Sequence, residues 1–181
     1  MSLSLSRITK ANYISLARLF VLTPASVTFV LLEYWYVALF MLVVSGASDH
    51  LDGIIARREA TVSNFGVFLD LTADKTFVIA MFVCFLHQGL VPLWAVLVIV
   101  LRELMVTGLR CYAAAENIVI KPAPMGGWKI IITFVAMFAV VLHLDIAPHL
   151  VIGTAFLTAL SGIMYFYNAR TLLTKYLYYP Q

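Results

Sequence analysis

Residues 49–74 read DHLDGIIARREATVSNFGVFLDLTAD and place four aspartates inside a strongly apolar chain. Asp49 and Asp52 are three residues apart, and Asp70 and Asp74 are four apart, so each pair projects from one face if its segment is helical. A short polar link between the two segments would let antiparallel helices bring the four carboxylates together. Converging carboxylates at a membrane boundary predict a site for divalent metal ions.

The composition around this stretch is that of a membrane protein. The chain has 181 residues, of which 63% are hydrophobic and 12% are charged, and its mean hydropathy is +0.98. Soluble domains carry about 25% charged residues. The net charge of +3 is modest, and no nucleic-acid partner is expected. No linker or composition break divides the chain, so residues 1–181 are predicted to form a single membrane domain.

Six apolar stretches are each long enough to cross about 30 Å of hydrocarbon at about 1.5 Å per residue. A short polar segment, residues 1–12, precedes them and is expected to lie at the membrane interface. The predicted fold is therefore all-α, a polytopic integral membrane protein with six transmembrane helices. The predicted spans are residues 13–32, 35–56, 66–87, 91–115, 127–144 and 149–171.

The positions of lysine and arginine orient these spans. With the N-terminus in the cytoplasm, the external connections fall near residues 33–34, 87–91 and 144–148, and none of them contains a lysine or arginine. Basic residues concentrate in cytoplasmic loops. Both termini and the aspartates are therefore predicted on the cytoplasmic side of a bacterial inner membrane. The basic residues placed there are Arg7, Lys10, Arg57, Arg58, Lys121, Lys129, Arg170 and Lys175.

Charged residues also occur inside the predicted spans. A charge at such a position costs about 2.5–3.5 kcal/mol on insertion scales, so it usually has a partner and a function. Arg102, Glu103 and Arg110 occupy the cytoplasmic half of the fourth span, and Arg18 lies near the start of the first. The aspartates and Lys75 lie at the cytoplasmic ends of the second and third spans. Polar groups from at least four helices thus reach one depth, which predicts a cavity just inside the cytoplasmic boundary.

Small residues flank the aspartates on their helical stripes and leave room for a bulky ligand. Gly53 and Ala56 share the stripe of the first pair, Gly66 shares that of the second, and Arg57 can neutralise a phosphate. Such a set suits Mg²⁺ or Mn²⁺ bridging a pyrophosphate. A spare carboxylate could then take a proton from an incoming hydroxyl.

Two other interpretations of the aspartates stay open on chemistry alone. They could be ion-paired with basic residues and hold helices together, or they could bind the cation of a cation-coupled transporter. The basic residues available for such pairing are Arg18, Lys75, Arg102 and Arg110.

The full spacing, D-x2-D-G-x2-A-R-x8-G-x3-D-x3-D, resembles the signature of the CDP-alcohol phosphotransferase family. The resemblance implies an integral-membrane enzyme, usually a homodimer, that uses two divalent ions, Mg²⁺ or Mn²⁺. Such an enzyme moves a phosphatidyl or similar group from a CDP-linked donor to an acceptor hydroxyl and releases CMP. The signature is met at every position, by Asp49, Asp52, Gly53, Ala56, Arg57, Gly66, Asp70 and Asp74.

The resemblance also implies separate roles for these residues. Asp49, Asp52 and Asp70 are carried over as metal ligands, and Asp74 as the general base, with a metal-binding role for Asp74 left open. The residues implied to bind the CDP part of the donor are Gly53, Ala56, Arg57 and Gly66.

The likeness extends over nearly the whole chain to family members that use CDP-diacylglycerol as donor and glycerol 3-phosphate as acceptor. It includes the opening ANYISLARLFVLTP and the segment RELMVTGLR. One lysine and one threonine of their fifth-helix entry are missing here, so inositol phosphate or serine stays open as acceptor. The cations predicted to hold the acceptor phosphate are Arg102, Arg110, Lys129 and Lys75. Each of these cations could instead pair with Glu103 or an aspartate.

Overall fold

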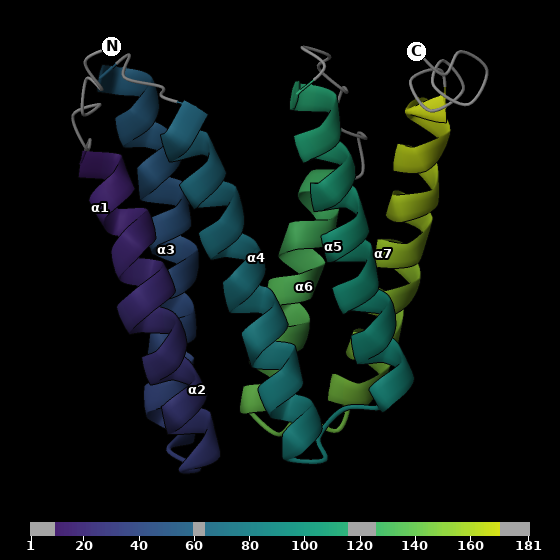
Figure 1. Cartoon of the computed structure of the whole chain (residues 1–181). Coiled ribbons are helices and arrows are strands. Elements are labelled where there is room, and N and C mark those ends of the chain that lie inside the picture. The colour runs from purple at the N-terminus through teal and green to yellow at the C-terminus, as the bar shows by residue number, and fades with distance from the viewer. Residues whose placement is uncertain (1–9, 60–63, 116–125, 171–181) are drawn as a thin grey trace. The chain divides into compact units, whose positions relative to one another are not determined.

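The computed structural model describes residues 10–59, 64–115 and 126–170, and every regular element within these ranges is a helix (Figure 1). The side chains of residues 10–12, 49–59, 64–68, 70, 71, 114, 115, 126 and 127 lie outside this description. The elements are α1 (Lys10–Ala17), the π-helical turn η1 (Arg18–Leu22), α2 (Thr23–Leu31), α3 (Trp35–Glu59), α4 (Asn64–His87), α5 (Leu93–Ala115), α6 (Gly126–Val141) and α7 (Ala147–Asn168).

The all-α prediction is confirmed. Because α1, η1 and α2 follow one another without a break, the elements of the described ranges form six helical rods, close to the six predicted segments. Among the described residues, two stretches are long and apolar enough to cross a membrane, Tyr13–Leu31 and Ala147–Asn168, and shorter apolar helices cover Trp35–Ser48 and Trp128–Val141. Six membrane crossings stay a prediction, and residues 1–9 lie outside the described part.

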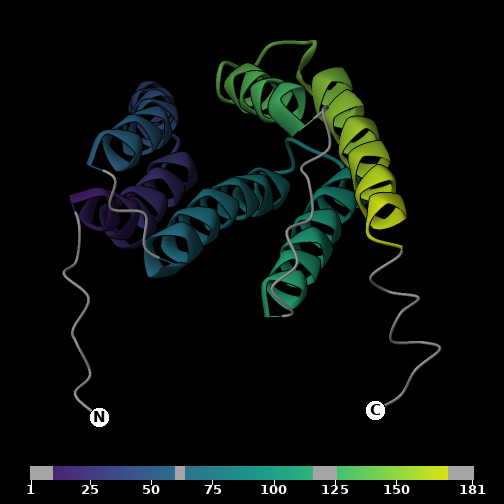
Figure 2. The same ribbon diagram turned by 90° about the horizontal axis from the view of Figure 1, so that it is seen from above.

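The chain divides into two compact units, residues 1–88 and 89–181. In the first unit, the continuous helix from α1 to α2 packs against both α3 and α4 (Figure 2). In the second, α7 packs against both α5 and α6. Each unit thus has one helix that contacts its two neighbours. The prediction of a single domain stays a prediction.

Each unit buries its own apolar residues, yet many large apolar side chains point outward. Phe20, Tyr36 and Ile163 are 69%, 88% and 67% exposed. Outward apolar side chains on long helices are typical of a protein surrounded by lipid. The buried core of the first unit includes Leu42, Phe77, Met81, Phe82 and Phe85, and that of the second includes Ile99, Met137, Val140 and Val151.

Three helices end in tight turns at or beside the connections predicted to be external. Glu33, Gly89 and His143 have positive φ values of 61°, 71° and 51°, the left-handed conformation that ends many helices. After α2, the Tyr34 N–H donates to the Phe29 carbonyl at 2.9 Å, and the two rings lie 6.3 Å apart. A backbone hydrogen bond and a contact between the Phe29 and Tyr34 rings thus stabilise the C-terminal end of α2.

Candidate active site

The aspartates of the signature lie on α3 and α4, the two helices on either side of residues 60–63. Asp49 and Asp52 lie in the second half of α3, and Asp70 and Asp74 lie in the first half of α4. The prediction that both pairs are helical is therefore confirmed. Of the four side chains, only that of Asp74 is described. The remaining signature positions, also outside the described side chains, are Gly53, Ala56 and Arg57 on α3 and Gly66 on α4.

Asp74 lies on a partly open face of α4 and contacts the next residue. Its Oδ2 accepts from the Lys75 Nζ at 3.4 Å, and both side chains are 22% exposed. The flanking residues Ala73 and Phe77 are each 1% exposed. A partly exposed ion pair contributes little to stability and rearranges easily. Asp74 is thus held on a well-packed helix while its carboxylate remains accessible to a ligand.

Arg18 is buried inside the first unit by an irregular turn of its helix. Pro24 has no N–H to continue the α-helical ladder, and the helix widens into η1, where the Thr23 N–H bonds the Arg18 carbonyl. The Thr23 hydroxyl donates to the same carbonyl at 2.9 Å. Such π turns often occur at functional sites. This one belongs to the predicted N-terminal motif.

The Arg18 side chain ties this helix to α3 directly beside the aspartates. Arg18 is 2% exposed, and its Nε donates to the Ser48 Oγ at 3.2 Å. The Ser48 hydroxyl in turn donates to the Ser45 carbonyl at 2.9 Å. Because Ser48 immediately precedes Asp49, the contact fixes α3 at the point where the signature starts.

A buried charge cluster joins the three helices of the second unit. Arg102 Nη1 donates to Glu103 Oε1 at 3.0 Å, and the Lys129 Nζ donates to the same oxygen. Arg102 Nη2 donates to the Ser161 Oγ on α7 at 2.8 Å. Glu103, Lys129 and Ser161 are 3%, 9% and 1% exposed. One carboxylate oxygen thus brings together two of the predicted acceptor cations, one from α5 and one from α6.

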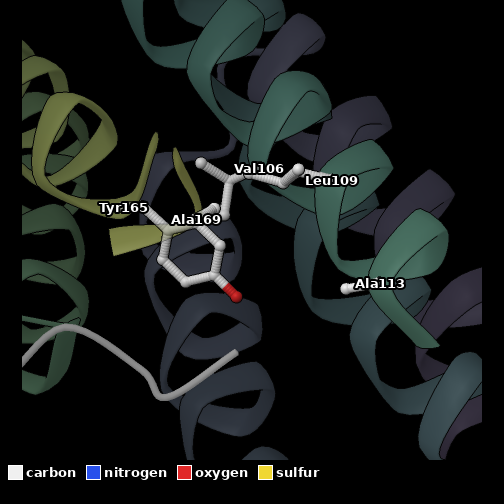
Figure 3. Packing of buried hydrophobic residues seen from close by; sticks show 5 residues of the cluster. All are labelled: Val106, Leu109, Ala113, Tyr165 and Ala169. Carbon is white, nitrogen blue, oxygen red and sulfur yellow. The ribbon is translucent and has the colours of Figure 1, made fainter. Parts of the chain in front are cut away.

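Arg110 makes a separate contact between α5 and α7. Its Nε donates to the Tyr165 hydroxyl at 3.0 Å, and its guanidinium carbon lies 5.3 Å from the centre of the same ring. Tyr165 is 2% exposed. The apolar cluster around it consists of Val106, Leu109, Ala113, Tyr165 and Ala169 (Figure 3). Arg110 lies about 12 Å along α5 from Arg102, at about 1.5 Å per residue.

Within the second unit, the predicted acceptor cations make two separate sets of contacts. Arg102 and Lys129 share Glu103, Arg110 contacts Tyr165, and Lys75 lies beside Asp74 in the other unit. The sequence analysis did not single out Ser161, Gly162 or Tyr165. Their signal is faint, since they are small or aromatic residues spaced four apart on an apolar helix.

An all-helical chain with an aspartate pattern on two consecutive helices and buried basic residues on others has the features of a membrane enzyme for phosphate esters. The chain belongs to the CDP-alcohol phosphatidyltransferase family, whose sequence model matches residues 8–166. The resemblance first seen in the signature is confirmed.

Curated relatives match different shares of the chain. The CDP-diacylglycerol–glycerol-3-phosphate 3-phosphatidyltransferase of Bacillus subtilis is 37% identical over 103 residues, 57% of this chain. The chain spans only about half, 53%, of that relative's length. The protein of the same name from Rickettsia bellii is 30% identical over 174 residues, covering 86% of this chain and 92% of the relative.

A solved structure supports the fold. The chain is similar to the crystal structure of the phosphatidylinositol phosphate synthase of Mycobacterium tuberculosis in its apo form, with a TM-score of 0.67. The identity is 16%, and the match covers 90% of each chain. At this identity, the likeness supports the arrangement of the helices alone.

Proposed function

We propose that this protein transfers the phosphatidyl group of CDP-diacylglycerol to glycerol 3-phosphate, giving phosphatidylglycerophosphate and CMP in phospholipid biosynthesis. The observation that carries the proposal is the complete aspartate signature on α3 and α4 of a chain that belongs to this family. The names of the Bacillus subtilis and Rickettsia bellii relatives support the choice of donor and acceptor.

The proposed enzyme works in the bacterial inner membrane. Its six helical rods would each cross the bilayer, with both termini and the aspartates on the cytoplasmic side. The exposed apolar side chains and the tight turns without lysine or arginine near 33–34, 87–91 and 144–148 support this arrangement. The lipid chains of the donor would enter sideways from the bilayer, and two copies are proposed to form a homodimer.

Two divalent ions, Mg²⁺ or Mn²⁺, are proposed as cofactors. The donor set fits them, because carboxylate oxygens are the ligands that hard cations prefer, and Asp74 is partly open to a ligand. Asp49, Asp52 and Asp70 would hold the ions, which when bound would offset the negative charge of the leaving phosphate. Gly53, Ala56, Arg57 and Gly66 would line the site of the donor's CDP part.

Asp74 is the proposed general base. Its carboxylate would accept the proton of the 1-hydroxyl of glycerol 3-phosphate while that oxygen forms a bond to the phosphorus bearing diacylglycerol. The bond from this phosphorus to the oxygen of CMP breaks, and CMP leaves with the bonding electrons. Asp74 later returns its proton to solvent. Lys75, at 3.4 Å, can hold the carboxylate in place before the acceptor arrives.

The buried cluster favours a phosphorylated acceptor. Arg102 and Lys129 bring two cationic side chains to one carboxylate of the second unit. A dianionic phosphate is suited to such a cluster, whereas serine or free inositol brings no comparable negative charge.

An acceptor panel tests the proposed function. Purified protein is given CDP-diacylglycerol, Mg²⁺ or Mn²⁺, and in turn glycerol 3-phosphate, inositol 3-phosphate, inositol or serine, and CMP release is measured. We expect release with glycerol 3-phosphate and none after chelation of the metal. Release with another acceptor alone would reassign the substrate, and no release with any of them would refute the transferase.

A further inference from the structure

We propose that Arg18 is a positioning residue for the metal site, which acts through Ser48 on the half of α3 that carries two of the signature aspartates. This inference rests on the proposed function for the identity of that site as a metal site. Its physical basis lies wholly within the first unit, on the continuous helix from α1 to α2 and on α3 and α4.

The π turn η1 lies against both helices that carry the aspartates. It contacts α3 and α4, and Arg18 is its first residue. Arg18 is 2% exposed, whereas Phe20 and Val21 of the same turn are 69% and 66% exposed. The turn therefore buries its charged side chain and leaves two large apolar ones on the outside. A buried guanidinium needs hydrogen-bond partners, and Ser48 of α3 is one of them.

The spacing of the buried residues shows what the π turn does. An α-helix keeps residues on one face at steps of three and four, and a step of five needs the wider i to i+5 bonding of a π turn. The Arg18 carbonyl accepts from the Thr23 N–H, five residues on. Arg18 thus stays on the buried face of its helix. The buried residues of this helix, among those described, are Ser15, Arg18, Thr23, Ser26 and Val30.

The contact with Ser48 reaches the start of the proposed metal site. The Arg18 Nε donates to the Ser48 Oγ at 3.2 Å, and the Ser48 hydroxyl donates to the Ser45 carbonyl at 2.9 Å. Arg18 is thereby linked to the backbone of α3, and Asp49 is the next residue of that helix. Groups that orient a metal site from behind its ligands typically change metal affinity by about 10- to 100-fold.

A positioning role and a purely electrostatic role of Arg18 predict opposite effects on metal binding. A cation near the aspartates repels a divalent ion, so loss of its charge alone would strengthen metal binding. If Arg18 instead orients α3, breaking its contact with Ser48 weakens metal binding. Ser48→Ala breaks the contact and keeps the charge, whereas Arg18→Met removes both.

Ser26 provides a matched control for Ser48. It is fully buried, and its hydroxyl donates to the Leu22 carbonyl of its own helix at 2.7 Å. Ser26→Ala therefore removes a buried serine hydroxyl from the same unit and leaves the contact between Arg18 and Ser48 in place.

The test is the affinity of purified protein in detergent for Mn²⁺, without donor or acceptor, measured from the electron paramagnetic resonance signal of free Mn²⁺. We expect Ser48→Ala and Arg18→Met each to raise the Kd for Mn²⁺ about tenfold, as for other groups that orient metal ligands. Ser26→Ala should change this Kd less than about twofold, since it breaks no contact with α3. Adding Ser48→Ala to Arg18→Met should change the Kd by less than a further factor of about two, because both substitutions remove the same contact.

A wild-type Kd for Mn²⁺ in Ser48→Ala would overturn the inference, even if that variant unfolds at a lower temperature, because the contact would then be structural only. Equal weakening in Ser26→Ala, a lower Kd in Arg18→Met or no binding of Mn²⁺ by the wild type would also overturn it. If Arg18→Met does not fold, Ser48→Ala compared with Ser26→Ala decides.

Mn²⁺ binding is measured without turnover, so this inference and the proposed function can fail separately. Mn²⁺ binding that weakens in Ser48→Ala, in a protein that releases no CMP with any acceptor, would refute the transferase but support the positioning role of Arg18. CMP release by a protein whose Mn²⁺ affinity is unchanged in Ser48→Ala would support the transferase and refute the positioning role.

Discussion

Asp74 is the residue on which the proposed chemistry depends most. The family resemblance separates it from the other three aspartates, and the structure holds it on a helix whose neighbouring faces are buried at Ala73 and Phe77. Its carboxylate is partly exposed. Among the described residues, its ion-pair partner is the Lys75 amine, 3.4 Å from Oδ2. These features suit a group that must exchange a proton with a substrate.

Replacement of Asp74 by asparagine keeps the shape of the side chain and removes the base. We expect Asp74→Asn to lower kcat by about 10²- to 10⁴-fold, the usual contribution of general base catalysis, while the affinity for CDP-diacylglycerol changes little. Steady-state CMP release and donor binding check this. Asp145→Asn, on an exposed connection, is the matched control and should have normal activity. Loss of donor binding in Asp74→Asn would make Asp74 a metal ligand instead.

At the scale of elements, the sequence predicts the helices well because the apolar stretches have the length of a membrane crossing and the breaks carry turn residues. Glu33, Gly89 and the segment around His143 mark ends that the structure confirms. The π turn at Arg18–Leu22 was not predicted. Pro24 signals an irregularity, but a proline in the first turn of a new helix and a proline after a widened turn look alike in sequence.

The hydrogen bond between Arg18 and Ser48 gives a stability prediction for the helix from α1 to α2. Ser48→Ala removes the hydroxyl that accepts from the Arg18 Nε at 3.2 Å. Hydrogen bonds to charged groups contribute about 1.5–3 kcal/mol, so the free energy of unfolding should fall by about that amount, with lower activity. Thr28→Ala, whose exposed hydroxyl bonds only the Pro24 carbonyl of its own helix, should cost less than about 0.5 kcal/mol. Thermal unfolding in detergent compares the two variants, and equal losses would contradict the role of Arg18.

At the scale of the whole molecule, the class of fold and the family follow from the sequence, but the partners of the charged residues do not. Arg102 contacts Glu103 beside it, which spacing allows, and also Ser161, 59 positions away. The sharing of Glu103 by two cations depends on the packing of α5, α6 and α7. Sequence periodicity defines helical faces but not which faces meet, so the predicted cations could be named without their grouping.

The arrangement of the whole chain in the membrane has a direct test. A fluorescent protein fused after Gln181 should be bright, because it folds in the cytoplasm. A fusion to the chain truncated after Gln88, on a connection predicted to be external, should be dark. An alkaline phosphatase fused at the same two positions should give the reverse pattern. Phosphatase activity at the C-terminus would overturn the topology.

The most direct test of the central claim follows one oxygen atom through the reaction. Glycerol 3-phosphate carrying ¹⁸O at its 1-hydroxyl is supplied with CDP-diacylglycerol and divalent metal, and both products are analysed by mass spectrometry. If the acceptor hydroxyl attacks the phosphorus that bears diacylglycerol, the label appears in phosphatidylglycerophosphate and CMP is unlabelled. Release of CMP with unlabelled phosphatidic acid would show hydrolysis by water and contradict transfer.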